Sequence, residues 1–155
     1  YNLEGNVINT HSILDNDKYN VIIASSETWQ PFRSVIDILN TDIMDRFQSV
    51  AQFTVIYISE AHAADIWPIG LSAGVINYKH KSLEDRISYA KTFIKRHNFN
   101  IPVVVDSMDN KFRDTFAAWP FRAFIVKNDV IQYISNISDS EYDILELYQF
   151  LGDKM

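Results

Sequence analysis

Acidic, imidazole and aromatic side chains follow directly on a short apolar run in the middle of the chain. Glu60 ends this run, His62 lies two residues further on, and Trp67 comes soon after. An imidazole titrates close to neutral pH, so a histidine that a carboxylate orients can give or take a proton without a redox partner. The pair predicts an acid/base site in which His62 moves the proton and Glu60 orients its ring. A purely structural role for the two residues is an equally good interpretation.

Two other loops carry polar side chains at corresponding places. The first, residues 25–31, contains Glu27 and Thr28, and the second, residues 106–110, contains Asp109. Loops at the carboxyl ends of parallel strands converge and bind ligands in open α/β sheets. These three residues also precede helical patterns, where they would cap a helix or complement its dipole. For Glu27, that structural interpretation is the favoured one.

The composition excludes several kinds of chemistry. The 155 residues include no cysteine, which excludes disulfides, thiolate zinc sites, iron–sulfur clusters and thiol catalysis. The four histidines lack the HxH and HExxH spacings, and no GxGxxG, P-loop or GxSxG motif is present. A metal site built from His62, His80 and carboxylates has no support in the spacing. We therefore predict no metal and no cofactor.

Net charge and hydropathy limit the classes of partner that this protein can have. Twenty acidic residues against 14 basic ones give a net charge of −6, which argues against nucleic acid or an anionic membrane surface as partner. No run approaches the roughly 18 apolar residues of a membrane-spanning helix. No membrane anchor is visible in the sequence, but the chain begins at Tyr1 without a methionine, so an anchor upstream of it is compatible with the sequence. The sequence does not indicate a cellular compartment.

The elements that must position these side chains follow from hydrophobic periodicity. Short β-branched runs bounded by polar residues indicate strands of a parallel sheet buried on both faces. Apolar residues at helical spacing follow Pro31 and Ser82, and Ser82 with Asp85 resembles a capping box. The expected strands are residues 20–25, 53–59 and 101–106, and the expected helices between them are residues 32–47 and 83–94.

The last third of the chain predicts a hairpin and a final helix. Two apolar strands over residues 122–134 flank a turn at Asn128 and Asp129. Ser140 is expected to cap a helix whose apolar stripe covers residues 144–151. The order of elements predicts an α/β fold with right-handed crossovers. The length suits a single domain, with residues 1–19 as an N-terminal extension and residues 20–155 as the core.

Several segments match a known family in the same order. The specific strings are EAHxxDxW from Glu60, HxSLEDR from His80 and VVVDSMDN from Val103, and shorter matches are Thr28-x-x-Pro31-Phe32 and Pro120-x-Arg122. Together they resemble the iodothyronine deiodinases, selenoenzymes with a thioredoxin-like fold related to the peroxiredoxins. The similarity runs from about residue 20 to residue 133. It implies a single thioredoxin-like domain with a central mixed sheet flanked by helices.

The chain departs from the family at the nucleophile. In the family, selenocysteine follows the threonine and lies two residues before the proline of the Pro-Phe pair; that position is Trp29 here. Indole is not a covalent nucleophile, and no cysteine is present to complete a redox cycle. Because some genetic codes read the selenocysteine codon UGA as tryptophan, Trp29 could also represent an original selenocysteine. The altered neighbours Glu27 and Gln30, often cysteine and proline in the family, argue against that explanation.

The rest of the family's site survives in this sequence. By resemblance, Glu60, His62 and His80 match an acidic residue and two histidines linked to substrate binding and proton delivery. Arg122 matches a basic residue beside the active site. The resemblance thus implies that the proton-handling groups are retained while the redox nucleophile at position 29 is lost.

Three functional hypotheses follow. The first is a pocket for an aromatic or phenolic small molecule with non-redox acid/base chemistry by His62, Glu60 and His80. The second is an inactive pseudoenzyme that binds a ligand or a protein partner, with a homodimer implied by the family. The third is a deiodinase whose selenocysteine is represented by Trp29. The expected binding residues are Thr28, Trp29, Trp67 and Arg122, with Trp119 added for a recognition surface.

Overall fold

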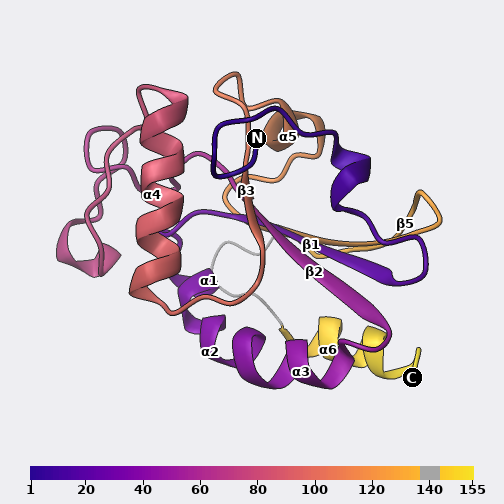
Figure 1. Ribbon diagram of the computed structural model, residues 1–155. Helices are drawn as coiled ribbons and strands as arrows, with labels where there is room; N and C mark the ends of the chain where they lie inside the picture. Colours follow the sequence, from indigo (N-terminus) through magenta and orange to yellow (C-terminus); the bar gives the residue numbers. More distant parts are fainter. Residues whose placement is uncertain (137–143) are drawn as a thin grey trace.

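A five-stranded mixed sheet forms the centre of the computed structural model, which describes residues 1–136 and 144–155 (Figure 1). The strand order is β3-β2-β1-β4-β5. The three strands of the first half, β1 (Tyr19–Ser25), β2 (Ala51–Tyr57) and β3 (Val103–Val105), run parallel to one another. The hairpin strands β4 (Arg122–Lys127) and β5 (Val130–Ile134) are antiparallel, and β4 pairs with β1.

The parallel strands are buried on both faces, as their continuous apolar sequences predict. In β1, Val21 and Ile23 join one hydrophobic cluster, and Ile22 and Ala24 join a second cluster on the other face. β3 is shorter than the expected run because only its three valines pair with β2. On the other side of β3, the backbone of Tyr1 forms two hydrogen bonds with Val105, each 2.9 Å long. The N-terminal segment thus covers one edge of the sheet.

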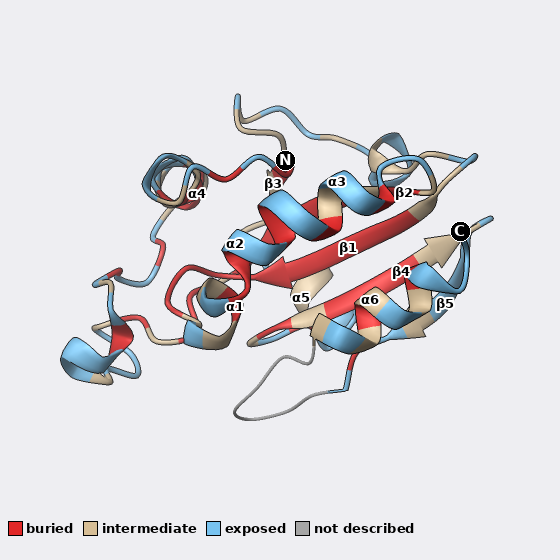
Figure 2. Ribbon diagram, turned by 90° about the horizontal axis from the view of Figure 1, so that it is seen from below, coloured by how far each residue is buried: buried red, intermediate tan, exposed pale blue. Residues whose placement is uncertain are grey.

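The helical pattern after Pro31 forms several short segments instead of one helix. They are α1 (Gln30–Ser34), α2 (Ile36–Ile38), a π-helical turn (Leu39–Ile43) and α3 (Met44–Phe47). Figure 2 shows the buried side of these segments turned toward the sheet. The buried apolar residues recur at a spacing slightly above the roughly 3.6 residues of an α-helical turn, and the wider π turn absorbs the difference. The apolar stripe was therefore predicted correctly and the continuous helix was wrong.

Helix α4 (Leu83–Arg96) begins as the sequence predicts. The Ser82 hydroxyl accepts a hydrogen bond from the backbone N–H of Asp85 at 3.2 Å. Ile87, Ala90 and Phe93 pack from this helix into the same cluster as the segments α1 to α3. The short helix α5 (Lys111–Thr115) packs through Phe112 on the second cluster instead, so the sheet has a helical layer on each face.

The hairpin and the final helix complete the fold. Asn128 and Asp129 both have positive φ, of 52° and 59°, as the tight turn between β4 and β5 requires. Helix α6 (Ile144–Gly152) buries Leu147 and Leu151, whereas its expected cap, Ser140, lies outside the described residues. Two short 3-10 helices, Thr10–Ile13 and Gly70–Ala73, were not predicted. Within the described part of the chain, no helix has the length and apolar character needed to cross a membrane.

Candidate functional site

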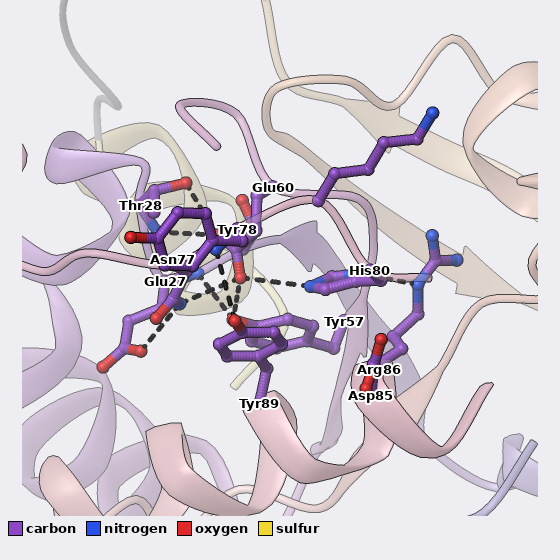
Figure 3. A network of polar contacts seen from close by, with 12 residues as sticks. Glu27, Thr28, Tyr57, Glu60, Asn77, Tyr78, His80, Asp85, Arg86 and Tyr89 are labelled. Atoms are coloured by element: carbon purple, nitrogen blue, oxygen red, sulfur yellow. Dashed lines mark hydrogen bonds and ion pairs between the residues drawn. The ribbon is translucent and has the colours of Figure 1, made fainter. Parts of the chain in front are cut away.

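A buried carboxylate organises the loops beyond the carboxyl ends of β1 and β2. The Glu60 side chain has no solvent exposure and accepts hydrogen bonds from the Tyr57 hydroxyl at 2.5 Å and from Thr28 (Figure 3). The Thr28 hydroxyl donates at 2.6 Å and its backbone N–H at 3.1 Å. The loop after β1 is thereby tied to the loop after β2, since both contacts converge on one carboxylate oxygen.

Two further donors complete the environment of Glu60. Asn77 Nδ2 donates to Glu60 at 3.0 Å, and His80 Nε2 lies 3.4 Å away. Burial alone would raise the pKa of Glu60, but hydrogen bonds from His80, Thr28 and Tyr57 outweigh it and hold that pKa below its usual value. Burial and the neighbouring Glu60 charge in turn raise the pKa of Tyr57 well above its usual value. The arrangement is that of an ionised carboxylate beside a neutral phenol.

The second ring nitrogen of His80 is occupied by Arg86. Arg86 Nε donates to His80 Nδ1 at 3.0 Å. Because Nδ1 accepts this hydrogen bond, the proton of the neutral ring must lie on Nε2, where it faces Glu60. The guanidinium also donates to the carbonyl groups of Asp106 and Ser107 and to Asn110 Oδ1, at 3.0, 2.6 and 2.9 Å. Arg86 therefore connects α4 to the loop after β3 while it orients His80.

Glu27 does not cap α1, contrary to the favoured expectation. Its side chain is fully buried, and its carboxylate lies 2.6 Å from Arg96 Nη1 and 3.1 Å from His97 Nε2. Asn77 Nδ2 donates to Glu27 at 3.1 Å as well as to Glu60. Glu27 thus fastens the end of α4 to the loop after β1, because a fully buried carboxylate needs charged and hydrogen-bonding partners more than a short helix needs a cap.

His62 is placed differently from the expectation that Glu60 orients its ring. The imidazole stacks on Trp29 with ring centroids 5.8 Å apart and meets the edge of Trp67 at 5.4 Å. The backbone N–H of His62 donates to the Thr28 hydroxyl at 3.0 Å, and this hydroxyl donates to Glu60. Glu60 is therefore linked to the backbone of His62 through Thr28, and not to its ring. Among the described residues, the buried Nδ1 of His62 has no hydrogen-bond partner.

A cleft of about 360 Å³ opens above this polar network. Glu60 and His80 lie at its polar side, and Trp67 and Trp119 form an aromatic wall with their rings stacked at 6.0 Å. The two indoles are 55% and 38% exposed, so both offer ring surface to a ligand. The peptide bond between Trp119 and Pro120 is cis. The remaining lining residues are Ser59, Ala61, Ala63, Ile66, Lys79, Arg86, Met108, Asn110 and Arg113.

Comparison with known proteins decides the family. A family model described as iodothyronine deiodinase matches residues 6–155. A type I iodothyronine deiodinase from Xenopus laevis is 34% identical over 134 residues, which cover 86% of this chain and 52% of that protein. The protein belongs to the iodothyronine deiodinase family. A human type II iodothyronine deiodinase is 32% identical over 139 residues, with 84% of this chain and 49% of that protein covered. The chain spans about half the length of these curated relatives.

Solved structures confirm the thioredoxin-like fold expected for a deiodinase relative. A secreted disulfide oxidoreductase from Mycobacterium tuberculosis aligns with a TM-score of 0.63 at 13% identity, over 98% of this chain and 92% of that chain. A thioredoxin-like protein from Porphyromonas gingivalis gives a TM-score of 0.62 at 14% identity, over 98% and 85%. At such low identity, these likenesses establish the fold alone.

The site residues predicted for a deiodinase-like pocket are divided between the cleft and its border. Glu60, His80 and Trp67 line the cleft, whereas His62 reaches it through its contact with Trp67. Thr28 and Trp29 do not line the cleft; Thr28 donates a hydrogen bond to Glu60, and Trp29 stacks on His62. Arg122 is not among the lining residues; it donates to the carbonyl of Phe116 at 3.2 Å. No group of three or more residues able to hold a metal occurs in the part of this deiodinase relative that the structure describes.

Sequence reasoning missed three members of the deiodinase-like site. Tyr57, Asn77 and Arg86 bind Glu60 or His80 directly. For Arg86 a signal was available, since it lies three residues after Leu83 and four before Ala90, on the apolar stripe of α4. A charged residue on an apolar helix face must find buried partners. Tyr57 and Asn77 carry no such signal.

Proposed function

We propose that this protein binds an aromatic or phenolic small molecule in the cleft that Trp67 and Trp119 wall on one side. The observation that carries the proposal is the combination of a stacked, exposed indole pair with a polar floor of buried, hydrogen-bonded groups. Apolar walls with a few fixed polar groups are the usual make-up of a small-molecule site. Indole faces stack favourably on planar rings, and the cleft volume is within the range of such sites.

His62 is the group that we propose for non-redox proton transfer. Glu60 is occupied by the donors described above, and His80 is held on both nitrogens by Arg86 and Glu60. In the described part of the chain, the buried Nδ1 of His62 has no hydrogen-bond partner, and the ring borders the aromatic wall through Trp67. A free imidazole at the border of a binding cleft is placed to exchange a proton with a bound phenol.

Binding without turnover is the second candidate function, and one specific observation favours it. The carboxylate and imidazole that a catalyst would use, Glu60 and His80, are both fully engaged with protein groups. Residues saturated in this way stabilise the floor of a cleft rather than change protonation during a reaction. A pseudoenzyme would need the binding surface of Trp67 and Trp119 alone.

The residue at position 29 bears on whether this chain can deiodinate a substrate. Trp29 lies in the loop after β1, as the N-cap residue of α1, and its ring stacks on that of His62. This location supports the assignment of Trp29 to the family's selenocysteine position. With an indole there and no cysteine in the chain, reductive deiodination lacks both an attacking chalcogen and a resolving thiol. We therefore propose that this chain does not deiodinate iodothyronines by itself.

A ligand screen tests the proposal. Phenols, biphenyls and iodothyronines are titrated against the protein by calorimetry, a readout that does not depend on the three tryptophans. We expect saturable binding that Trp67→Ala abolishes and Leu71→Ala, a change at a surface residue 92% exposed, leaves intact. Binding unaffected by Trp67→Ala contradicts the cleft as the site.

Product analysis separates the two candidate functions. Iodide release from thyroxine with dithiothreitol is expected to equal that of a protein-free control, and release above it refutes the loss of deiodination. A non-redox product that His62→Ala eliminates while binding persists supports acid/base catalysis by His62. Binding with no product from any probe supports the pseudoenzyme.

A further inference from the structure

The cleft carries a charge opposite to that of the molecule. The protein has a net charge of −6, yet three cationic residues, Lys79, Arg86 and Arg113, line the cleft against the single carboxylate of Glu60. The charge of Glu60 is satisfied by the hydrogen bonds that converge on it. A positive cleft in an acidic protein concentrates anions at one place on its surface.

The three cationic side chains differ in how many of their N–H donors already form hydrogen bonds with protein acceptors. Arg86 is 2% exposed and donates four hydrogen bonds to protein acceptors, so it has little left for a ligand. Arg113 uses Nε for Asp114 at 2.7 Å and Nη1 for Ser59 at 3.1 Å. Within the described residues, its Nη2 and the ammonium of Lys79 have no protein acceptor.

We propose that Lys79 and Arg113 form an anion subsite that binds the carboxylate of an aromatic acid while its rings lie against Trp67 and Trp119. This inference rests on the proposed function of the cleft and names the chemical class of its ligand. Arg113 comes from α5 and Lys79 from the loop that precedes α4. Two cations from separate segments that line one cleft are placed to meet one anion from two directions.

A carboxylate fits this subsite better than a neutral polar group. Hydrogen bonds from guanidinium or ammonium to a carboxylate are shorter and roughly twice as strong as those between neutral partners. The Asp114 carboxylate that neutralises part of Arg113 is 60% exposed, so solvent screens it more than a ligand enclosed by the cleft. A cationic ligand would instead meet Lys79 and Arg113 with like charge.

The test uses a matched pair of probes, biphenyl-4-carboxylate and biphenyl-4-carboxamide, which differ in charge but hardly in shape. Calorimetric titrations at low ionic strength are expected to show the acid binding about tenfold more tightly than the amide. Arg113→Gln should weaken acid binding about tenfold, and Lys79→Gln about threefold because Lys79 is an exposed residue. Both variants should weaken binding of the amide much less than binding of the acid, and retained amide binding shows that the cleft remains folded.

The control is Lys81→Gln, which removes an exposed lysine two residues from Lys79 that does not line the cleft. Its affinity for the acid should equal that of the wild type, and a loss as large as that of Lys79→Gln overturns the subsite in favour of general surface charge. Equal binding of acid and amide overturns the anion subsite and leaves the proposed function intact. Failure of both probes to bind overturns the two together.

Discussion

Arg86 donates a hydrogen bond from Nε to Nδ1 of His80 across 3.0 Å. This contact determines which nitrogen of the imidazole carries the proton, since an accepting nitrogen cannot hold one. The Nε2 proton then faces Glu60, 3.4 Å away. An arginine from α4 therefore sets the tautomer of a histidine in the cleft, and it does so from a position where the guanidinium has little contact with solvent.

The first prediction concerns Arg86→Gln. The change removes the donor to His80 and leaves buried carbonyl groups of the loop after β3 unpaired, which costs about 1–3 kcal/mol for each buried acceptor left without a donor. We expect a lower free energy of unfolding in urea and a mixture of His80 tautomers in ¹⁵N spectra. Arg86→Lys keeps the charge but lacks the planar fork, so it should restore stability only in part and leave the tautomers mixed.

The control for Arg86 lies on the same helix. Lys95→Gln changes an exposed position of α4 and should alter neither stability nor the His80 spectrum. A wild-type spectrum with the proton on Nδ1 of His80 contradicts the assignment. An Arg86→Gln protein with unchanged tautomers shows that Glu60 alone orients the ring.

Local patterns predicted much of the fold, and non-local contacts account for what they missed. The cap at Ser82 and the turn at Asn128 depend on neighbours within four residues, and both were predicted correctly. Glu27 was misassigned to a cap because its partners, Arg96 and His97, lie 69 and 70 residues away along the chain. Only the folded chain brings these charges together, and burial of the carboxylate then requires the pairing.

The difference between local patterns and non-local contacts also explains which features of the candidate site were predicted and which were missed. Glu60 follows the end of β2, His80 lies in the loop before α4, and both line the cleft. The sequence pattern singled out Glu60, and the family resemblance alone added His80. The pairing between them was not predicted, because the rotation of a side chain about its own backbone is set by packing. His62, two residues after Glu60, turns toward Trp29 and Trp67 instead.

The second prediction is an acid-dependent loss of stability through Glu60. The pKa of Glu60 is lowered in the folded protein from its usual value of 4.5. Its ionised form therefore contributes stability that is fully present above pH 4.5 and is lost as the pH falls through the lower folded pKa. Glu60→Gln should unfold more easily at pH 7, by about 1.5–3 kcal/mol for each charge-assisted hydrogen bond lost. The gap to the wild type should narrow below pH 4.5.

Urea unfolding at several pH values between 3 and 7 measures this gap. Glu4→Gln serves as the matched control, because Glu4 is exposed and its carboxylate has no hydrogen bond within the described residues. That variant should follow the wild-type curve. A gap between Glu60→Gln and the wild type that stays constant down to pH 3 is incompatible with a lowered pKa for Glu60.

The third prediction is a loss of folding stability at alkaline pH through Tyr57. Burial, followed by the charge of Glu60, raises the pKa of Tyr57 well above its usual value of 10.0. A phenol of this kind contributes stability that is fully present below pH 10 and is lost as the pH rises toward the folded pKa, since only the unfolded chain ionises readily. Tyr57→Phe should lower stability at pH 7 by about 1.5–3 kcal/mol and flatten the decline above pH 10.

Tyrosinate absorbance at 295 nm follows the ionisation of Tyr57 directly. In the wild type, one tyrosine should ionise only when the protein unfolds, and Tyr57→Phe should remove that late step. Tyr78→Phe, which changes a tyrosine that is 53% exposed, should leave it in place. A titration of Tyr57 together with the exposed tyrosines contradicts the buried phenol.

The last prediction tests position 29 as the site of the family's nucleophile. The chain has no cysteine, so Trp29→Cys introduces a single thiol whose labelling by iodoacetamide is unambiguous. The indole it replaces stacks on His62, and a neighbouring imidazolium lowers the pKa of a thiol below its ordinary value and so favours the thiolate. We expect Trp29→Cys at pH 7 to react about tenfold faster than Gln30→Cys, whose thiol lies at an exposed neighbouring position. Adding His62→Ala to Trp29→Cys should remove the difference, because the activation depends on the imidazole and not on solvent access. Equal rates for the two single-cysteine proteins, or a fast rate that survives His62→Ala, would show that position 29 is not adjacent to a group able to activate a nucleophile.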